Sequence, residues 1–207
     1  MNLFIFAQSS SSRRVRIALS LKALDFTTTV LNPEKAGNSH FDDDFRLVNP
    51  QALVPLLEDN GHYFHQSLAI LEYLEEQYPD PPLLPSTAEG RAKVRGLALE
   101  IACEVHPISS LKTLAALKSR LGTDDQKALA WSRHFLDKGL GEIEVRLNSW
   151  HSAGDFCYGT RPTLADCFLI PQVFNAIRFG CDVGAHRRVS AVYEACMALP
   201  AFRDAFV

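Results

Sequence analysis

The 207-residue sequence lacks any long uncharged segment, since no stretch free of Asp, Glu, Lys and Arg exceeds 12 residues. A helix that spans a membrane needs about 20 mostly apolar residues, so we expect no such helix and no membrane partner. The first residues, Met1–Ala7, also lack the basic start of a secretory signal and favour a short strand. At roughly 100–200 residues per domain, the length allows one or two domains.

An excess of positive charge is also missing. The chain has 21 basic and 24 acidic side chains and a net charge of −3, whereas nucleic-acid-binding domains usually carry a basic excess. We therefore expect no nucleic-acid partner. The charge is unevenly divided, with a net charge of −5 in residues 1–85 and +2 in residues 86–207, which favours two structural units.

Cysteine is scarce. The five cysteines all follow residue 100, their number is odd, and no CxxC pair occurs. A disulfide framework and a zinc site are therefore disfavoured, and reduced thiols are typical of a cytoplasmic protein. His62 and His65 flank a strand-like Tyr63-Phe64 pair, which places the two histidines on opposite faces, so we expect no metal site.

The first part of the chain alternates between strand and helix patterns. Apolar or β-forming runs at Leu3–Ala7 and Phe26–Leu31 flank a helical pattern at Arg13–Ala23, which predicts a βαβ unit. A loop is expected at Asn32–Asn38, and a short acidic helix at Phe41–Val48.

A hairpin is predicted next. Leu53–Leu57 and His62–Phe64 favour strands on either side of the Asp59-Asn60-Gly61 turn, although Pro55 has no N–H for a ladder. Ser67 is expected to be the N-cap of the helix that follows.

Proline then marks a boundary. Four prolines between Pro79 and Pro85 cannot continue a helix and predict an extended connector. Thr163 and Asp166 are spaced as a capping box. The patterns beyond the connector are helical: Thr87–Arg120 with an interruption near His106-Pro107, Asp124–Trp150, Thr163–Gly180 and Ser190–Leu199. We expect three parts, namely an α/β domain at 1–78, a Pro-rich linker at 79–86 and an all-helical domain at 87–207.

Four serines, Ser9 to Ser12, lie between the first strand and the first helix of the βαβ unit. The N-terminus of a helix has unpaired N–H groups and a partial positive charge, so it attracts anions. Hydroxyls there can donate hydrogen bonds to an anion or a thiolate. The alternative is that one serine caps the helix and the others are solvated.

Two further segments have features suited to a peptide ligand. A cis proline at Pro55 would leave the Val54 backbone able to pair with an extended ligand, whereas a trans proline at a sheet edge is the alternative. Gln66-Ser67 opens a second helix, whose N–H groups and hydroxyl can hold a carboxylate, with simple capping as the alternative.

Together these features resemble the cytosolic glutathione transferases over nearly the whole chain. The zeta-class signature Ser-Ser-Cys-Ser-x-Arg-Val-Arg-Ile-Ala-Leu resembles residues 9–19, which read Ser-Ser-Ser-Ser-Arg-Arg-Val-Arg-Ile-Ala-Leu. Further zeta-like segments are Asn49-Pro50 with Val54-Pro55, Gln66 to Glu76, Pro162 to Asp166 and Val173 to Phe179. The resemblance implies an α/β thioredoxin-like N-terminal domain plus an all-α C-terminal domain, with glutathione as cofactor and a homodimer as the assembly.

The resemblance also implies roles for matching residues. Ser9 matches the serine that hydrogen-bonds the glutathione thiolate, and Ser11, in place of the motif cysteine, is the second residue expected to be catalytic. The Val54 backbone would pair with the cysteinyl part of glutathione, and Gln66 and Ser67 would hold its γ-glutamyl carboxylate. The full set implied for glutathione binding is Ser10, Arg14, His40, Leu53, Val54, Gln66, Ser67, Ser109 and Ser110.

The substrate site departs from the family pattern. Arg178 matches an arginine that binds a substrate carboxylate, helped by Lys112 or Arg13, although it also suits the C-terminal end of its helix. Gln8 and Lys112 stand where related isomerases resemble one another in carrying arginine, and Ser109-Ser110 replaces an Asn-Asn or Gln-Asn pair. We interpret Gln8, Lys112 and Arg178 as an altered substrate-binding set.

The zeta class includes maleylacetoacetate and maleylpyruvate isomerases. The resemblance therefore implies glutathione-dependent cis–trans isomerisation of a maleyl diacid by thiolate addition, rotation and elimination, with a small carboxylate electrophile as the partner. Two alternatives stay open. One is a transferase that acts on other electrophiles by conjugation, haloacid dehalogenation or peroxide reduction, and the other is a non-catalytic glutathione-binding protein.

Overall fold

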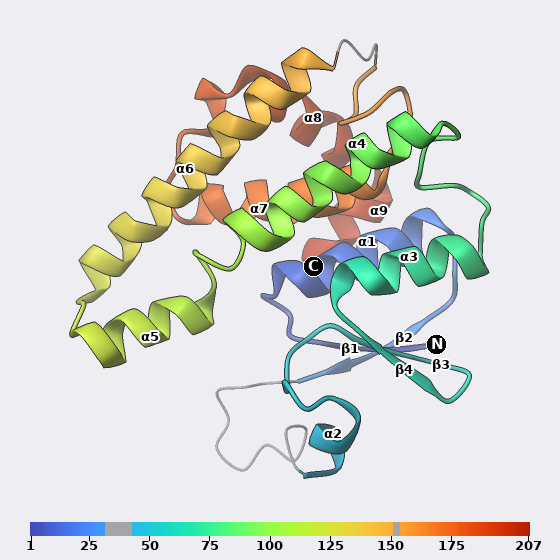
Figure 1. Cartoon of the computed structure of the whole chain (residues 1–207), viewed down its shortest axis with the longest axis horizontal. Coiled ribbons are helices and arrows are strands. Elements are labelled where there is room, and N and C mark those ends of the chain that lie inside the picture. Colours follow the sequence, from blue (N-terminus) through green and yellow to red (C-terminus); the bar gives the residue numbers. More distant parts are fainter. Residues whose placement is uncertain (32–42, 151–153) are drawn as a thin grey trace. The chain divides into compact units, whose positions relative to one another are not determined.

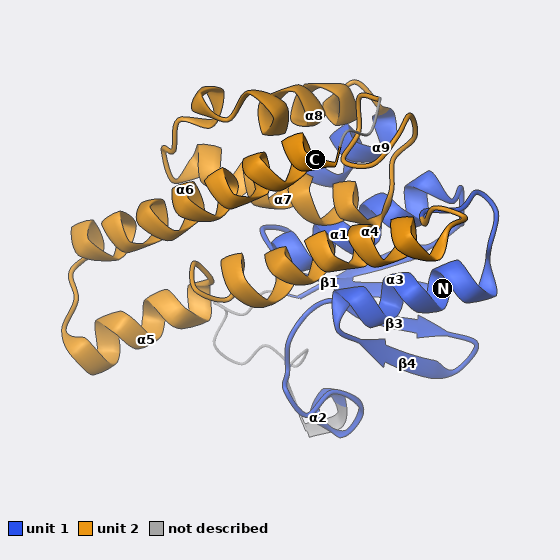
Figure 2. Ribbon diagram, turned by 45° about the horizontal axis from the view of Figure 1, so that its top comes forward, with its two compact units in different colours: residues 1–83, 200–207 blue, residues 84–199 orange. Residues whose placement is uncertain are grey.

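The computed structural model describes residues 1–31, 43–150 and 154–207. The chain divides into two compact units, shown in Figure 2: unit 1 contains residues 1–83 and 200–207, and unit 2 contains residues 84–199. The predicted loop at Asn32–Asn38, the residue His40 and the first two residues of the predicted acidic helix lie outside the described residues. No helix in the described ranges has the length and apolar character needed to cross a membrane.

Unit 1 is built on a four-stranded sheet of order β2-β1-β3-β4. Strand β1 pairs in parallel with β2 and antiparallel with β3, and β3 pairs antiparallel with β4, with Leu57 opposite both Leu3 and Phe64. The elements are β1 Asn2–Ile5, α1 Ser10–Leu21, β2 Thr27–Val30, α2 Asp43–Val48, β3 Leu56–Asp59, β4 His62–His65 and α3 Ser67–Gln77. The predicted βαβ unit and hairpin are therefore confirmed.

Successive side chains of a strand point to opposite faces of the sheet, and helices pack on both faces of this one. Leu3 and Ile5 in β1 are buried on one face, and α1 and α3 cover that side in Figure 1. Phe4 points to the other face, where its ring centroid lies 6.0 Å from that of Phe45 in α2. Phe4 and Val54 both pack against a small apolar cluster of Leu31, Phe45 and Leu56, so the core of unit 1 helps to fix the position of the segment before β3.

A buried ion pair anchors the Pro-rich connector to unit 1. The Nζ atom of Lys22 lies 2.8 Å from Oε2 of Glu75, and both side chains are almost completely buried. Lys22 also donates hydrogen bonds to the carbonyl groups of Tyr78 and Pro81, and Glu75 accepts one from the N–H of Leu83. The pair therefore satisfies backbone groups that the prolines leave without helical partners.

The last residues of the chain belong to unit 1, although the sequence assigns them to the helical domain. They form α9, Pro200–Arg203, and a 3-10 turn at Asp204–Phe206. Arg16 of α1 donates hydrogen bonds to the carbonyl groups of Asp204 and Ala205, at 2.9 and 3.1 Å. The guanidinium of Arg13 lies 4.8 Å from the ring centroid of Phe206. These contacts depend on residues nearly 190 positions apart, which local patterns do not reveal.

In its described residues, unit 2 is helical. Its elements are α4 Ala88–Leu99, a π-helical segment Glu100–Val105, α5 Leu111–Leu121, α6 Asp125–Ser149, α7 Leu164–Arg178, a 3-10 turn Val183–Ala185 and α8 Arg187–Met197. The predicted capping box at the start of α7 is confirmed, since the Thr163 and Asp166 side chains each bond to the other residue's backbone. Asp166 is completely buried and also accepts a hydrogen bond from the N–H of Cys157.

The π-helical segment packs closely on a glycine of α6. A Cβ atom at Gly139 would lie 2.7 Å from Cγ2 of Val105, far inside van der Waals contact. We expect Gly139→Ala to lower the free energy of unfolding by about 1–3 kcal/mol, because Val105 and the π-helical segment must move.

Gly141→Ala in the same helix is the matched control. Its Cβ would meet His186 at an ordinary 3.7 Å, so this variant should gain up to about 1 kcal/mol from helix propensity. Urea denaturation of both variants measures the difference. Equal stabilities for Gly139→Ala and Gly141→Ala would contradict the close packing.

Candidate functional site

The start of α1 brings the predicted serines into one hydrogen-bonded group. Ser9 is the N-cap, and its Oγ accepts a hydrogen bond from the N–H of Ser12 at 3.2 Å. The Oγ atoms of Ser9 and Ser11 are 2.9 Å apart, and Ser11 Oγ donates to the carbonyl of Val54 at 3.0 Å. Because Ser9 caps the helix, α1 begins at Ser10 and not near Arg13 as predicted. The serines therefore both cap α1, through Ser9, and contact another segment of the chain, through the bond from Ser11 to Val54.

Val54 presents backbone groups beside these serines. The Val54–Pro55 peptide bond is cis, and β3 begins only at Leu56, so the predicted strand at Leu53–Leu57 is wrong in its first residues. Pro55 has no N–H and cannot extend the ladder. Among the described residues, the N–H of Val54 has no hydrogen-bond partner, while its carbonyl receives Ser11. Both groups remain able to pair with an extended peptide, since a carbonyl accepts two hydrogen bonds.

Asn49 also holds the segment before Pro55, through the carbonyl of Leu53. It was not predicted as a site residue. Its side chain is buried, and Nδ2 donates to the carbonyl of Leu53 at 2.6 Å. Its backbone N–H donates to the carbonyl of Phe45, so it also closes the end of α2. An asparagine directly before a proline is a common turn signal, and that signal could have drawn attention to it.

The start of α3 differs from its prediction. Gln66, not Ser67, occupies the N-cap position, and it has a positive φ of 69° and no capping hydrogen bond. Ser67 is the first helical residue, and its Oγ accepts a hydrogen bond at 3.2 Å from the buried guanidinium of Arg14. The Gln66 amide donates to the side chain of Gln51 at 3.0 Å. The first N–H groups of α3 therefore have no side-chain cap, and a cation lies close to them, which suits a carboxylate.

Helix α1 connects all three segments. At its start Ser11, which is hydrogen-bonded to Ser9, donates to Val54, and one turn later Arg14 donates to Ser67. The hydrogen-bonding groups match the parts of glutathione in kind: a hydroxyl-lined helix start for a sulfur anion, a peptide N–H donor and C=O acceptor for an amide, and a second helix start for a carboxylate. The residues of unit 1 thus fit the tripeptide that the resemblance implies.

Two predicted residues of unit 2 have hydrogen bonds within their own segment. Ser109 is buried, and its Oγ donates to the carbonyl of Val105 at 3.2 Å. Ser110 is the N-cap of α5, where its Oγ accepts a hydrogen bond from the N–H of Thr113 at 3.3 Å. Both serines therefore help to shape the turn between the π-helical segment and α5.

The remaining predicted residues differ in exposure. Gln8 precedes the serines in unit 1 and is exposed, while Lys112 and Arg178 are exposed in unit 2. Arg178 lies in the last turn of α7, where a positive charge is also favoured by the helix dipole. Arg13 is buried beside Phe206, which leaves it poorly placed to help hold a substrate carboxylate. His40 lies outside the described residues.

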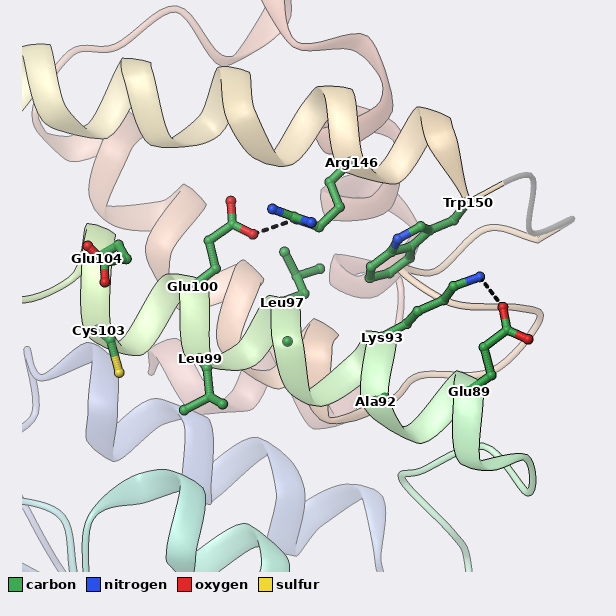
Figure 3. A pocket seen from close by; sticks show the side chains of 11 residues that line it. Glu89, Ala92, Lys93, Leu97, Leu99, Glu100, Cys103, Glu104, Arg146 and Trp150 are labelled. Atoms are coloured by element: carbon green, nitrogen blue, oxygen red, sulfur yellow. Dashed lines mark hydrogen bonds and ion pairs between the residues drawn. The ribbon is translucent and has the colours of Figure 1, made fainter.

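A cavity of about 640 Å³ occurs elsewhere in unit 2, lined by α4, the π-helical segment and the end of α6. Figure 3 shows ion pairs between Arg146 and Glu100 and between Lys93 and Glu89 among its lining side chains. None of the predicted site residues lines this cavity. In the described part of the chain, no three His, Cys, Asp or Glu side chains are grouped so that they could hold a metal ion.

Comparison with known proteins identifies a matching family and several relatives of this chain. Residues 3–82 match the family model described as glutathione S-transferase, N-terminal domain. A probable maleylacetoacetate isomerase of Vibrio cholerae is 39% identical over 98% of this chain and 94% of its own length. The holo structure of a maleylpyruvate isomerase, a bacterial zeta-class glutathione S-transferase, is 40% identical with a TM-score of 0.94, covering 99% of this chain and 96% of its own. A maleylacetoacetate isomerase from Anaeromyxobacter dehalogenans, with dicarboxyethyl glutathione and citrate in its active site, is 36% identical with a TM-score of 0.83, over 99% and 93%.

Proposed function

Because the chain belongs to the zeta class of the glutathione transferases, we propose that it is a glutathione-dependent isomerase of the cis double bond of a maleyl diacid. The observation that carries the proposal is the hydroxyl-lined start of α1, joined to Val54 and, through Arg14, to Ser67. When bound, glutathione supplies the thiol that adds to the double bond and leaves again, so it is not consumed.

Ser9 and the α1 N-terminus favour an ionised sulfur. A free thiol has a pKa of about 8.5 and is mostly protonated at neutral pH. A hydroxyl donor and the partial positive charge of a helix start both stabilise the anion and lower that pKa. Ser9 is half-buried in this position, so its hydroxyl remains accessible to a ligand.

The peptide portion is held by backbone groups and by the start of α3. The N–H and carbonyl of Val54 suit the cysteinyl amide, and the uncapped start of α3 beside Arg14 suits the γ-glutamyl carboxylate. Both features orient the sulfur relative to the serines. Orientation of this kind removes translational and rotational freedom before the reaction begins.

The residues proposed to bind the substrate are Arg178, Lys112 and Gln8, as the family resemblance implies. The exposed cations can stabilise negative charge that develops on the carbonyl side of the double bond. The relative from A. dehalogenans holds a dicarboxyethyl derivative of glutathione together with citrate, which supports a carboxylate-bearing substrate for this chain.

The test is an assay of the purified protein with maleylacetoacetate and with maleylpyruvate, with and without glutathione. We expect the absorbance of one maleyl compound to change only when glutathione is present, and the total glutathione to stay constant. Consumption of glutathione with chlorodinitrobenzene, dichloroacetate or cumene hydroperoxide, without isomerisation, would instead identify a transferase for other electrophiles. Gln8 and Lys112 are the residues that favour this second candidate, because arginines are expected there.

Family membership also supports a symmetric homodimer in the cytoplasm. The five cysteines are free thiols, which suits a reducing compartment. Sedimentation equilibrium of the whole chain should give twice the monomer mass of 23.0 kDa, and a single monomeric species at micromolar concentration would remove the dimer from the proposal.

A further inference from the structure

The hydrogen bonds at the start of α1 have a fixed direction. A serine hydroxyl has one proton to donate, and a peptide carbonyl can only accept. Since Ser11 donates to the carbonyl of Val54, the proton between Ser9 and Ser11 must come from Ser9. The order is therefore Ser12 N–H to Ser9, Ser9 to Ser11, and Ser11 to Val54.

This order separates two serines that the sequence treats alike. Ser9 can redirect its proton to a sulfur anion and lose only its bond to Ser11, whereas Ser11 can do so only by releasing Val54. This order agrees with Ser9 as the hydroxyl donor that the family implies, and the geometry points to Ser11 as a positioning residue that fixes the Val54 carbonyl.

Ser11 joins two segments that are distant in sequence. Its bond to Val54 spans 43 residues, and Asn49 holds the adjacent carbonyl of Leu53. The segment before Pro55 is thus fastened at two successive carbonyls, one by a serine and one by an asparagine. The N–H of Val54, which has no partner in the part of the chain that the structure describes, is thereby held in place for a ligand amide.

This role depends on a hydroxyl at position 11. The zeta-class signature that residues 9–19 resemble has cysteine there, and a thiol is only a weak hydrogen-bond donor. The tie between α1 and Val54 is therefore a property that Ser11 gives to this chain. The inference rests on the proposed function, because it concerns how the same site holds glutathione.

The experiment compares Ser11→Ala, Ser11→Thr and Ser9→Ala with Ser20→Ala, an exposed position on α1, as the control. Calorimetry gives the Kd for glutathione, and the ultraviolet absorbance of the bound thiolate gives its ionisation midpoint as a function of pH. Steady-state assays separate KM for glutathione from kcat.

We expect Ser11→Ala to weaken glutathione binding about tenfold, the worth of one hydrogen bond, and to leave the ionisation midpoint in place. Ser11→Thr, which keeps the hydroxyl, should recover most of the affinity. Ser9→Ala should instead raise the midpoint by about 1–2 units. Ser20→Ala should match the wild type in all three measurements.

A midpoint that rises in Ser11→Ala as far as in Ser9→Ala would overturn the assignment, and so would an unchanged Kd in a folded Ser11→Ala protein. Ser11→Cys replaces the alanine variant if thermal unfolding shows that alanine prevents folding, since the thiol offers only a weak donor. Absence of any heat from glutathione with the wild type would reject the proposed function itself. Binding and isomerisation by the wild type with no effect of Ser11→Ala would reject only the role of Ser11.

Discussion

We expect Ser9→Ala to lower kcat/KM for the isomerisation at neutral pH by roughly 10–30-fold, because a rise of about 2 units in the pKa of the bound thiol, to about 8.5, leaves only a few per cent of it ionised at pH 7. Ser9 caps α1 and is the serine whose proton is not committed to a carbonyl. A drop of ~2 units in the pKa of the bound thiol is worth about 2.7 kcal/mol, and the part of this stabilisation that the hydroxyl contributes is lost in the alanine variant.

The loss should shrink as the pH rises. In the alanine variant the bound thiol ionises nearer to its free pKa of about 8.5, so the rate of the variant continues to climb above neutral pH where that of the wild type has levelled off. A pH profile of kcat for the two proteins measures this difference. Parallel profiles would show that Ser9 does not act on sulfur ionisation.

Ser9→Thr is the control for the capping role. Alanine also removes the acceptor for the Ser12 N–H and should cost about 1 kcal/mol of stability, whereas threonine keeps both the cap and the hydroxyl. Activity near the wild-type level in Ser9→Thr, together with a loss in Ser9→Ala that persists in fully folded protein, assigns the effect to the hydroxyl. Activity of Ser9→Ala within about threefold of wild type would contradict the role of Ser9.

Asp166→Ala should give the largest loss of stability. Asp166 is completely buried and accepts four hydrogen bonds, from the N–H of Cys157 and from the N–H and Oγ1 of Thr163, at 2.7–2.9 Å, and from the thiol of Cys196 at 3.7 Å. Burial raises the pKa of Asp166, and these hydrogen bonds act in the opposite direction. Alanine removes the acceptor of three strong buried donors and of the weak Cys196 thiol donor, which should cost roughly 3–6 kcal/mol.

A loss of that size is a large share of the roughly 5–15 kcal/mol that stabilises a typical domain. Guanidinium denaturation measures it, with Asp124→Ala as the matched control. Asp124 caps α6 in the same way, through the N–H of Lys127, but it is exposed, so its replacement should cost only about 1 kcal/mol. Comparable losses in the two variants would show that burial of Asp166 adds nothing to its capping role.

Much of the architecture was predictable because it depends on local sequence patterns. The strand before the serines, the hairpin turn at Asn60-Gly61 and the capping box at Thr163 each depend on residues within a few positions of one another. The family signature added the α/β and all-helical division. The structure confirmed these local elements, and the structure and the relatives confirmed the fold class.

The parts that escaped prediction depend on distant contacts. The π-helical segment is formed where Val105 meets Gly139, and no pattern in residues 100–105 reports that packing. Ser67 was expected to cap its helix, but its hydroxyl instead accepts a hydrogen bond from Arg14. The roles of Lys112 and Arg178 toward a substrate stay predictions, as does that of His40.

The placement of residues 200–207 bears on the order in which the protein folds. The carbonyl groups that accept hydrogen bonds from Arg16, and the ring beside Arg13, belong to residues 204–206, which follow the whole of unit 2 in the sequence. Domains usually fold in order from the N-terminus during synthesis, but unit 1 cannot complete its contacts before residues 200–207 have been synthesised. Nascent chains stalled before residue 200 should therefore expose the surface of α1 to proteases and chaperones.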